Sequence, residues 1–255
     1  MRELPILFSA PMIRALLAGT KTQTRRVIKP QPFSDGYYDG VVEMDRVIGV
    51  DGRVYWRASV SAVAGGAIRT EIIEPKYEVG DRLWVKETWR ANYGLDYYRE
   101  DLGRCPRPTD FDPKTTAIEY VADGTRELGG KTRVSIHMPR WASRLTLLVT
   151  DVRVERLQDI SEADARAEGV VWVDPTEDDY RWARDNNFPV SDMQGVWTVP
   201  GMKGVAKADV WGCTPQQSYQ FLWNTINGLG AWEANPWVVA VSFQVIHGNI
   251  DQLPA

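Results

Sequence analysis

Three segments with strong β-forming patterns lie far apart in this chain of 255 residues, and they limit the possible folds more than any other feature. They are rich in valine, leucine and aromatic residues, and they are found at 82–89, 144–156 and 236–246. A loop-rich stretch and a further predicted strand at 117–122 separate the first two, and short helical patterns and an insertion separate the last two. Several strands distant in sequence, with few helices, predict an α+β fold: a mixed β-barrel with short helices across its ends.

The start of the chain predicts a buried strand that leads into a helix. Residues 4–8 are a short apolar run, and Ser9 is suited to cap the helix that follows. Ile13, Leu16 and Leu17 then have the spacing of a helix face that packs on a core. Gly19 is suited to end the helix, because glycine adopts the left-handed conformation that a helix C-terminus needs.

Two further helices are predicted, at 160–170 and 215–226. Ser161 and Asp164 have the spacing of a capping box, in which each residue bonds the backbone of the other. The second helix has an apolar stripe formed by Phe221, Leu222 and Ile226. Both helices are short, so we expect them to cover a sheet rather than to form a bundle.

The composition favours one folded domain over residues 1–255. Hydrophobic residues make up 44% of the chain and charged residues 25%, which is enough for a sizeable core. We find no internal repeat and no low-complexity linker. Three stretches rich in glycine, proline and polar residues predict insertions at about 30–77, 90–114 and 172–213, the first of them carrying a hairpin.

The net charge of −4 conceals two segments of opposite sign. Residues 1–30 carry six basic residues and one acid, a net charge of +5, whereas residues 151–180 carry ten acids and three bases, a net charge of −7. A protein that coats a nucleic-acid backbone is usually basic overall. We therefore expect a local positive pocket for one nucleotide or a short single strand, rather than a long duplex footprint.

Cysteine and histidine are scarce, and this favours chemistry without a metal or a cofactor. The cysteines are Cys105 and Cys213, and the histidines are His137 and His247. These residues have neither the spacing of a zinc site nor the context of a Ser-His-Asp triad. The chain also lacks an apolar run of about 20 residues, so we expect no membrane partner and a cytoplasmic protein.

Four segments, taken in order, resemble the ASCH domain family, whose relatives are the PUA and EVE modules. Residues 17–26 (LAGTKTQTRR) are similar to the family signature, and 78–85 (EVGDRLWV) to its Gly-Asp strand. Residues 157–170 and 237–243 are similar to a later helix and to the closing strand. The resemblance covers about half of the chain and implies a PUA-like barrel, in the longer form common in phages and prophages.

The resemblance also implies a reaction, because small bacterial ASCH proteins include N4-acetylcytidine amidohydrolases. Their implicated lysine, threonine and glutamate fall on Lys21, Thr24 and Glu168, and the signature arginine falls on Arg26. The signature is not a phosphate-binding P-loop, because Gly19 ends a helix rather than opening one.

The residue types suit this chemistry. A threonine hydroxyl needs a base to act as a nucleophile, and a lysine can serve if burial and neighbouring arginines lower its pKa. In a regular strand Lys21 and Thr24 would face opposite sides, so we expect the chain to turn between them. Glu168 falls at a helix C-terminus, where the helix dipole disfavours its charged form, and this suits a group that handles protons.

Two more residues are candidates for substrate binding. Glu87 should face inward beside Leu83 and Val85, so it needs a cationic partner, for which Lys21 or Arg26 is the candidate. Such a pair would either take part in the chemistry or simply tie the strand to the signature. Trp84 is our candidate, among eleven tryptophans, for a residue that stacks on a base.

Three functions remain open at this stage. The first is a metal-independent amidohydrolase that acts on N4-acetylcytidine or a related modified pyrimidine nucleoside. The second is a non-catalytic module that binds RNA or modified DNA, since PUA-like barrels often bind without turnover. The third is a nuclease, which the acidic character of the chain disfavours. The pattern gives no indication of the oligomeric state.

Overall fold

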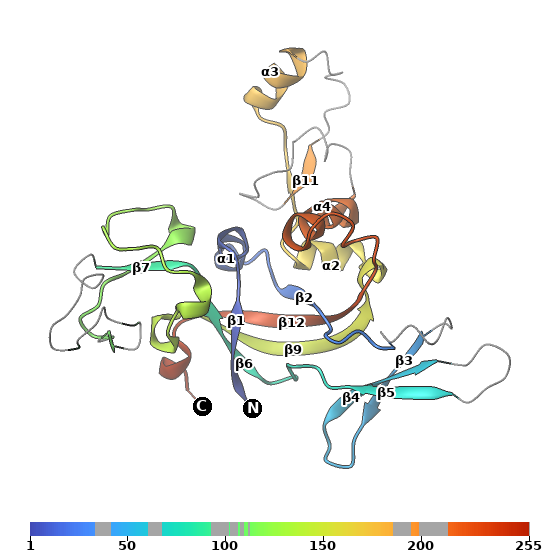
Figure 1. The fold of residues 1–255 in the computed structure, drawn as a ribbon. Coiled ribbons are helices and arrows are strands. Elements are labelled where there is room, and N and C mark those ends of the chain that lie inside the picture. Colours follow the sequence, from blue (N-terminus) through green and yellow to red (C-terminus); the bar gives the residue numbers. More distant parts are fainter. Residues whose placement is uncertain are drawn as a thin grey trace.

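The computed structural model describes residues 1–33, 42–60, 68–92, 102, 107, 110–111, 113–185, 195–198 and 214–254. Within these residues the protein is α+β, as predicted: twelve strands form several sheets, and four α-helices accompany them (Figure 1).

A five-stranded sheet forms the centre of the molecule. Its strands, in spatial order, are β1 (Glu3–Leu7), β6 (Arg82–Lys86), β9 (Leu145–Arg156), β12 (Trp237–His247) and β2 (Gln23–Val27). β1 and β6 are parallel, and the other neighbours are antiparallel. The three long β-segments predicted from the sequence are therefore neighbours in this sheet, although the first is shorter than predicted because it breaks at Glu87 and resumes as β7 (Trp89–Ala91).

The central sheet is strongly curved but does not close into a barrel within the described residues (Figure 1). β9 and β12 bend together, and their register shifts between Ser242 and Phe243. β1 and β2 remain the two edges of the sheet. A side chain connects these edges in place of a hydrogen-bond ladder, because the Arg26 guanidinium donates to the Leu7 carbonyl at 2.7 Å.

The concave core follows from the alternation of the strands. Leu83 and Val85 of β6 are almost fully buried, whereas Trp84 between them is only partly buried. They pack with Leu147 of β9 and Val241 of β12 in the largest hydrophobic cluster. Burying one large aliphatic side chain contributes about 1.5–3 kcal/mol, so this cluster holds the sheet together.

Three helices cover one side of the central sheet: α1 (Ala10–Leu17), α2 (Glu162–Ala167) and α4 (Pro215–Asn227) (Figure 1). Half of the predicted capping box of α2 is present, since the Ser161 hydroxyl accepts from the Asp164 N–H at 3.1 Å. The Asp164 carboxylate accepts from the Ser161 hydroxyl instead of from the Ser161 backbone. The predicted stripe on α4 was partly wrong. The helix buries Tyr219, Leu222 and Trp223, while Ile226 is exposed.

The remaining strands and α3 belong to smaller units, which project from the central sheet in Figure 1. The strands β3 (Val42–Ile48), β4 (Val54–Val60) and β5 (Arg69–Ile73) form an antiparallel sheet, one strand more than the predicted hairpin. β7 pairs with β8 (Ile118–Tyr120), and β10 (Val171–Val173) pairs with β11 (Val196–Thr198) near α3 (Glu177–Asp185). Short 3-10 helices lie at Val121–Asp123, Ser135–His137, Arg140–Ala142, Leu157–Asp159 and Ile250–Gln252.

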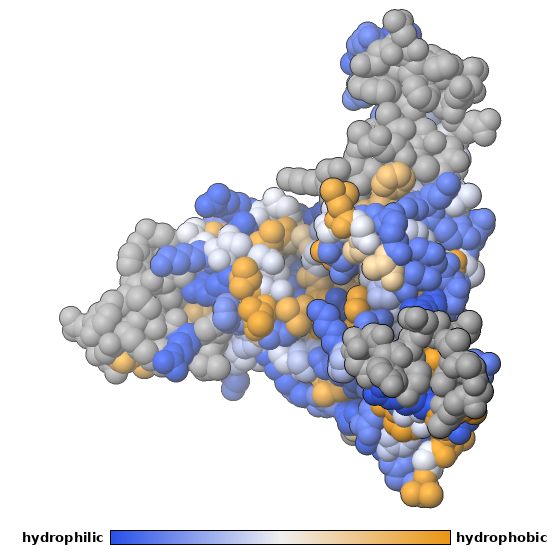
Figure 2. Space-filling view, turned by 45° about the vertical axis from the view of Figure 1, so that its right-hand side comes forward, coloured by the Kyte–Doolittle hydropathy of each residue, from blue (hydrophilic) through white to orange (hydrophobic). Residues whose placement is uncertain are grey.

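The β3–β5 sheet and the β10–β11 pair with α3 lie mostly within the predicted insertions at 30–77 and 172–213, and β7 and β8 flank the one at 90–114. The status of all three as insertions stays a prediction. Most of 90–114 and much of 172–213, including Cys105 and Cys213, lie outside the described residues. The face seen in Figure 2 is largely hydrophilic, with hydrophobic side chains at the far end of the β3–β5 sheet, where Ile48 and Val50 are exposed. Among the helices that the structure describes, none has both the length and the apolar character needed to cross a membrane.

Candidate functional site

Lys21 lies where the chain leaves α1 and enters β2. Gly19 has a positive φ of 72°, which allows the chain to turn back on the helix. The Thr22 N–H then donates to the Ala167 carbonyl at 2.8 Å, so this segment runs beside the end of α2. Gly169, with φ of 100°, permits the close approach, since a Cβ there would lie 3.3 Å from the Cβ of Ala15.

This arrangement buries Lys21 completely against the carboxyl end of α2. The Lys21 ammonium lies 2.6 Å from Oε2 of Glu168 and 2.9 Å from the backbone carbonyl of the same residue. Both partners are shielded from solvent, with side-chain exposures of 0% and 3%. Two residues that are 147 positions apart in the sequence therefore form one buried ion pair.

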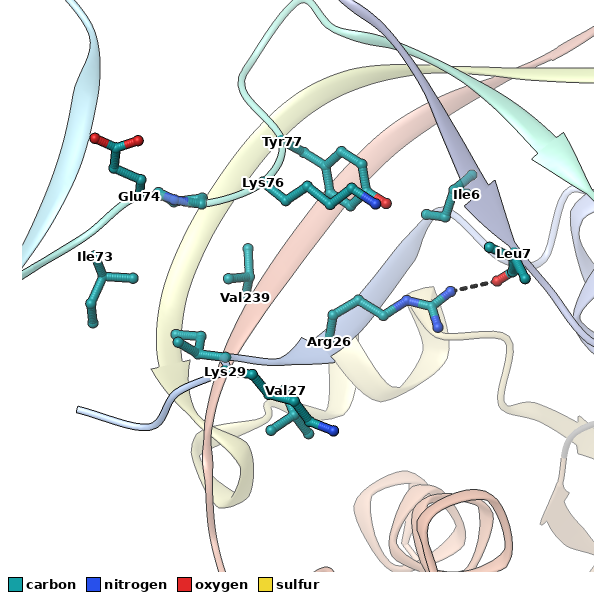
Figure 3. Close-up of a pocket in the computed structure, with 12 residues that line it drawn as sticks. Ile6, Leu7, Arg26, Val27, Lys29, Ile73, Glu74, Lys76, Tyr77 and Val239 are labelled. Atoms are coloured by element: carbon teal, nitrogen blue, oxygen red, sulfur yellow. Dashed lines mark hydrogen bonds between the residues drawn. The ribbon is translucent and has the colours of Figure 1, made fainter. Parts of the chain in front are cut away.

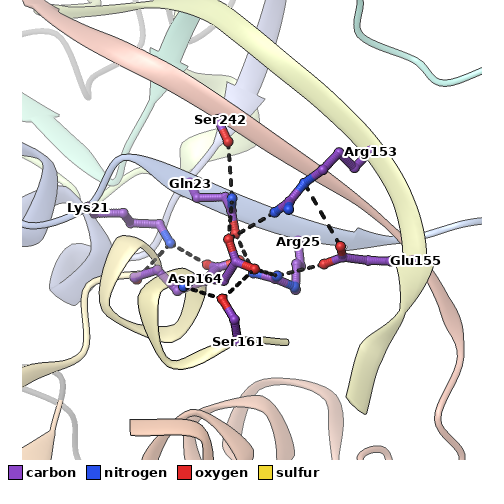
Figure 4. A network of polar contacts seen from close by, with 9 residues as sticks. Lys21, Gln23, Arg25, Arg153, Glu155, Ser161, Asp164 and Ser242 are labelled. Carbon is purple, nitrogen blue, oxygen red and sulfur yellow. Dashed lines mark hydrogen bonds and ion pairs between the residues drawn. The ribbon is translucent and has the colours of Figure 1, made fainter. Parts of the chain in front are cut away.

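Arg25 extends this pair into a network (Figure 4). Its guanidinium contacts Oε1 of Glu168 at 3.4 Å, Glu155 at 2.6 Å and Asp164 at 3.3 Å. Lys21 and Arg25 of the basic N-terminal segment are thus paired with acids of the acidic segment 151–180. The positive pocket predicted from the first 30 residues is not formed by Lys21 or Arg25, because acidic side chains surround both.

A pocket of about 250 Å³ opens beside the network. Thr24, Arg26 and Glu168 line it, together with Tyr219 and Trp223 of α4. The three residues that the family resemblance implied for catalysis therefore meet here: Thr24 and Glu168 line the pocket, and Lys21 lies behind Glu168. Within the described part of the chain, no hydrogen bond joins the Lys21 ammonium to the Thr24 hydroxyl, so the expected direct contact between the two is missing.

Burial lowers the pKa of Lys21, because the charged ammonium loses its hydration. The charge of Glu168 opposes this effect, and Arg26 and Arg25 add to it by repulsion. A lowered pKa was predicted from the sequence. The sequence suggested burial and the two arginines as causes, and the burial of Lys21 is the larger of them.

Tyr219 is a residue of the site that the sequence prediction missed. Burial raises its pKa well above the usual value, and the Glu168 carboxylate in hydrogen-bonding contact with its phenol adds to the shift. The Arg25 guanidinium lies 5.9 Å from its ring. Tyr219, Leu222 and Trp223 have the spacing of one helix face, and this spacing could have revealed the tyrosine. The same face also buries the polar residue Ser218, which a search for apolar positions does not place there.

Glu87 points inward as predicted, but its predicted partners were wrong. It is paired with Arg144, whose Nε and Nη2 lie 2.9 Å and 3.0 Å from the two carboxylate oxygens. Burial raises the pKa of Glu87, and Arg144 opposes that shift. The same arginine lies 4.0 Å from the Tyr120 ring and also binds Asp123. Glu87 therefore belongs to a separate ion pair and not to the pocket of Thr24.

Trp84 is not brought to this pocket either. Its ring lies 5.2 Å from the Lys86 ammonium, on the partly exposed side of β6. Trp223, which lines the pocket, is the tryptophan with access to a ligand there. Trp84 therefore does not line the pocket, and among the described residues Trp223 is the tryptophan that does.

No protein-family model, curated protein or solved structure matches this chain. In the part of the chain that the structure describes, no three His, Cys, Asp or Glu side chains gather in a way that could hold a metal ion.

Proposed function

We propose that this protein is a metal-independent amidohydrolase that removes the acyl group from N4-acetylcytidine or a related modified pyrimidine nucleoside. In this proposal the chain is a long ASCH protein, and its curved central sheet is a PUA-like fold. The supporting observation is that Lys21, Thr24 and Glu168, which the resemblance implied together, gather at one small pocket. Its volume of about 250 Å³ is close to the lower end for small-molecule sites.

The contacts suggest how the roles are divided. Glu168 borders the pocket and accepts the proton released when the Thr24 hydroxyl, or a water molecule, adds to the acyl carbon. The same proton then passes to the exocyclic nitrogen as the carbon–nitrogen bond breaks. If Thr24 is the nucleophile, a water molecule then hydrolyses the acyl-threonine ester and returns the hydrogen to the Thr24 hydroxyl. Overall, water supplies a hydroxyl to the acyl carbon and a hydrogen to the base, which gives a carboxylic acid and cytidine.

Lys21 and Arg26 complete this scheme. Because Lys21 touches Glu168 and not Thr24, it acts through the carboxylate by holding it in place and sharing its proton. Arg26 lines the pocket and supplies positive charge for the oxygen anion of the tetrahedral intermediate.

The test is to incubate the protein with N4-acetylcytidine and to measure cytidine by chromatography. We expect cytidine to form, with at least a hundredfold loss of rate in Lys21→Ala, because acid–base groups contribute about 10²–10⁴-fold. Glu87→Gln, which changes a buried carboxylate outside the pocket, serves as the control and should retain turnover per folded molecule. Product formation no greater than that of Lys21→Ala would reject the proposal.

The second candidate function, a nucleic-acid-binding module without catalysis, is favoured by one observation. The Lys21 ammonium makes two contacts with Glu168 and none with Thr24 within the described residues, so the pocket could hold a base without an activated nucleophile. In that case a cytidine-containing oligonucleotide would bind to the protein, binding would survive Lys21→Ala, and no acetyl group would be released.

A further inference from the structure

A second and larger pocket, of about 410 Å³, lies at the open side of the central sheet. It occupies the gap between the two unpaired edges, β1 and β2, and the segment that joins β5 to β6 closes it (Figure 3). Ile6, Val239 and Tyr77 provide apolar walls, and Arg26, Lys29 and Lys76 provide positive charge.

The cations of this pocket differ from those of the buried network. Among the described residues, no carboxylate lies within ion-pair distance of Arg26, Lys29 or Lys76. Arg26 donates only to the Leu7 carbonyl and lies 5.2 Å from the Phe8 ring. Lys29 and Lys76 are exposed. Glu74 is the single acid in the lining, so the pocket carries three positive charges and one negative charge.

The two pockets share a wall. Arg26, Val27 and Lys29 line both, because β2 passes between them. In Figure 3 the side chains of Arg26 and Lys76 both extend toward β1. Arg26 and Lys29, which line both pockets, are therefore within reach of a ligand in either one.

We propose that this second pocket binds a phosphate group attached to the nucleoside, so that the preferred substrate is a nucleotide or a short single strand rather than a free nucleoside. Unpaired lysines and arginines bind phosphate, and the apolar walls fit the sugar or base of an adjacent nucleotide. This inference rests on the proposed function, since it deepens the description of the same substrate.

The experiment compares four probes: N4-acetylcytidine, its 5′-monophosphate, its 3′-monophosphate, and a dinucleotide that contains it. Turnover and equilibrium binding are measured for each at two salt concentrations. The proteins are the wild type, Lys29→Ala, Lys76→Ala and Glu74→Gln. Arg126→Ala is the matched control, because Arg126 is exposed and lines neither pocket.

We expect at least one phosphate-bearing probe to bind about tenfold more tightly than the nucleoside, and to lose most of this advantage at high salt. Lys29→Ala and Lys76→Ala should each weaken the binding of that probe about three- to tenfold. Lys76→Ala should leave nucleoside binding unchanged, because Lys76 does not line the Thr24 pocket. Glu74→Gln should strengthen the binding of the phosphate-bearing probe, and Arg126→Ala should change nothing. The monophosphates and the dinucleotide distinguish a terminal phosphate from a strand backbone.

The outcomes separate this inference from the proposed function. If the nucleoside is hydrolysed but phosphate gives no gain in binding, or if the gain survives both lysine substitutions, the phosphate site is refuted while the hydrolase stands. If no probe is hydrolysed but the phosphate probes bind with the predicted response to Lys29→Ala and Lys76→Ala, the site stands and the hydrolase is refuted. If no probe is hydrolysed and the phosphate probes do not bind, both are refuted.

Discussion

Two buried ion pairs, Lys21–Glu168 and Glu87–Arg144, differ in their hydrogen-bond geometry and in their exposure to solvent. The Glu87 carboxylate receives two parallel hydrogen bonds from one guanidinium, which is the geometry that suits arginine and carboxylate best. Arg144 then continues to Asp123 and reaches solvent, with a side-chain exposure of 23%. The Lys21 ammonium has no exposure at all, and it binds one carboxylate oxygen and a carbonyl at the end of α2.

This difference in geometry and exposure suggests that the Glu87–Arg144 pair maintains the fold, whereas the Lys21–Glu168 pair serves the pocket. A bidentate pair whose arginine reaches solvent keeps more hydration than the Lys21 pair, and it fixes the end of β6 to the start of β9. A fully buried lysine loses all its hydration, and its partner borders a pocket instead of the core. A charge pair in that position is expensive for stability alone, so we assign its retention to the chemistry of the pocket.

The largest effect on stability should come from Glu87→Ala. It leaves the Arg144 charge partly buried without its main partner, and breaking such a pair costs about 3–5 kcal/mol of unfolding free energy. Urea denaturation at pH 7 measures this loss. Turnover per folded molecule should stay within about threefold of the wild type, which is below the range for an acid–base group. A hundredfold loss of turnover in the folded protein would place Glu87 in the chemistry and remove the contrast between the pairs.

The network around the first pair should give a smaller, acid-sensitive effect through Asp164. Burial by itself would raise the pKa of Asp164, but hydrogen bonds from Ser161, Gln23 and Arg153 and the charge of Arg25 lower it to about 2. Because the folded pKa lies below the unfolded value, this stabilisation is complete above pH 3.8 and is lost as the pH falls to about 2. The shift corresponds to about 2 kcal/mol.

Asp164→Asn tests this expectation by urea denaturation at several pH values. At pH 7 the wild type should be more stable than the variant by about 2 kcal/mol, and the two should converge as the pH approaches 2. If the two proteins differed in unfolding free energy by the same amount at pH 7 and at pH 2, the charge of Asp164 would not be the source of the stabilisation.

The smallest effect should come from the phenol beside Glu168. Tyr219→Phe removes one hydrogen-bonding group from the carboxylate, so we expect turnover to fall about tenfold. Tyr120→Phe is the matched control, because its phenol donates to the Ala142 carbonyl near the other ion pair. Equal losses in the two variants would show that neither phenol is specific to the chemistry.

The sequence was most informative where local rules decide structure. The Ser161 cap, the turn at Gly19 and the alternation of Leu83, Val85 and Glu87 depend on neighbours along the chain, and the structure has all three. The meeting of residues 21 and 168 was also expected, but from the family resemblance and not from any local pattern.

The misses all concern which distant segments lie together. Arg144 is 57 positions from Glu87, and only the pairing of β6 with β9 brings them into contact. Tyr219 was overlooked because the phase of α4 was chosen from apolar residues alone. The open edges of the central sheet, and the cationic pocket between them, depend on a strand order that periodicity does not encode.

The most direct test of the contrast is a double-mutant cycle on the first pair, with Lys21→Met, Glu168→Leu and the combined variant. Unfolding free energy and hydrolysis of N4-acetylcytidine are measured for all four proteins. We expect each single substitution to destabilise by about 3–5 kcal/mol, and the combined variant to regain most of that stability while producing no cytidine. A combined variant that hydrolyses N4-acetylcytidine at a rate close to that of the wild type would contradict the assignment of this pair to catalysis.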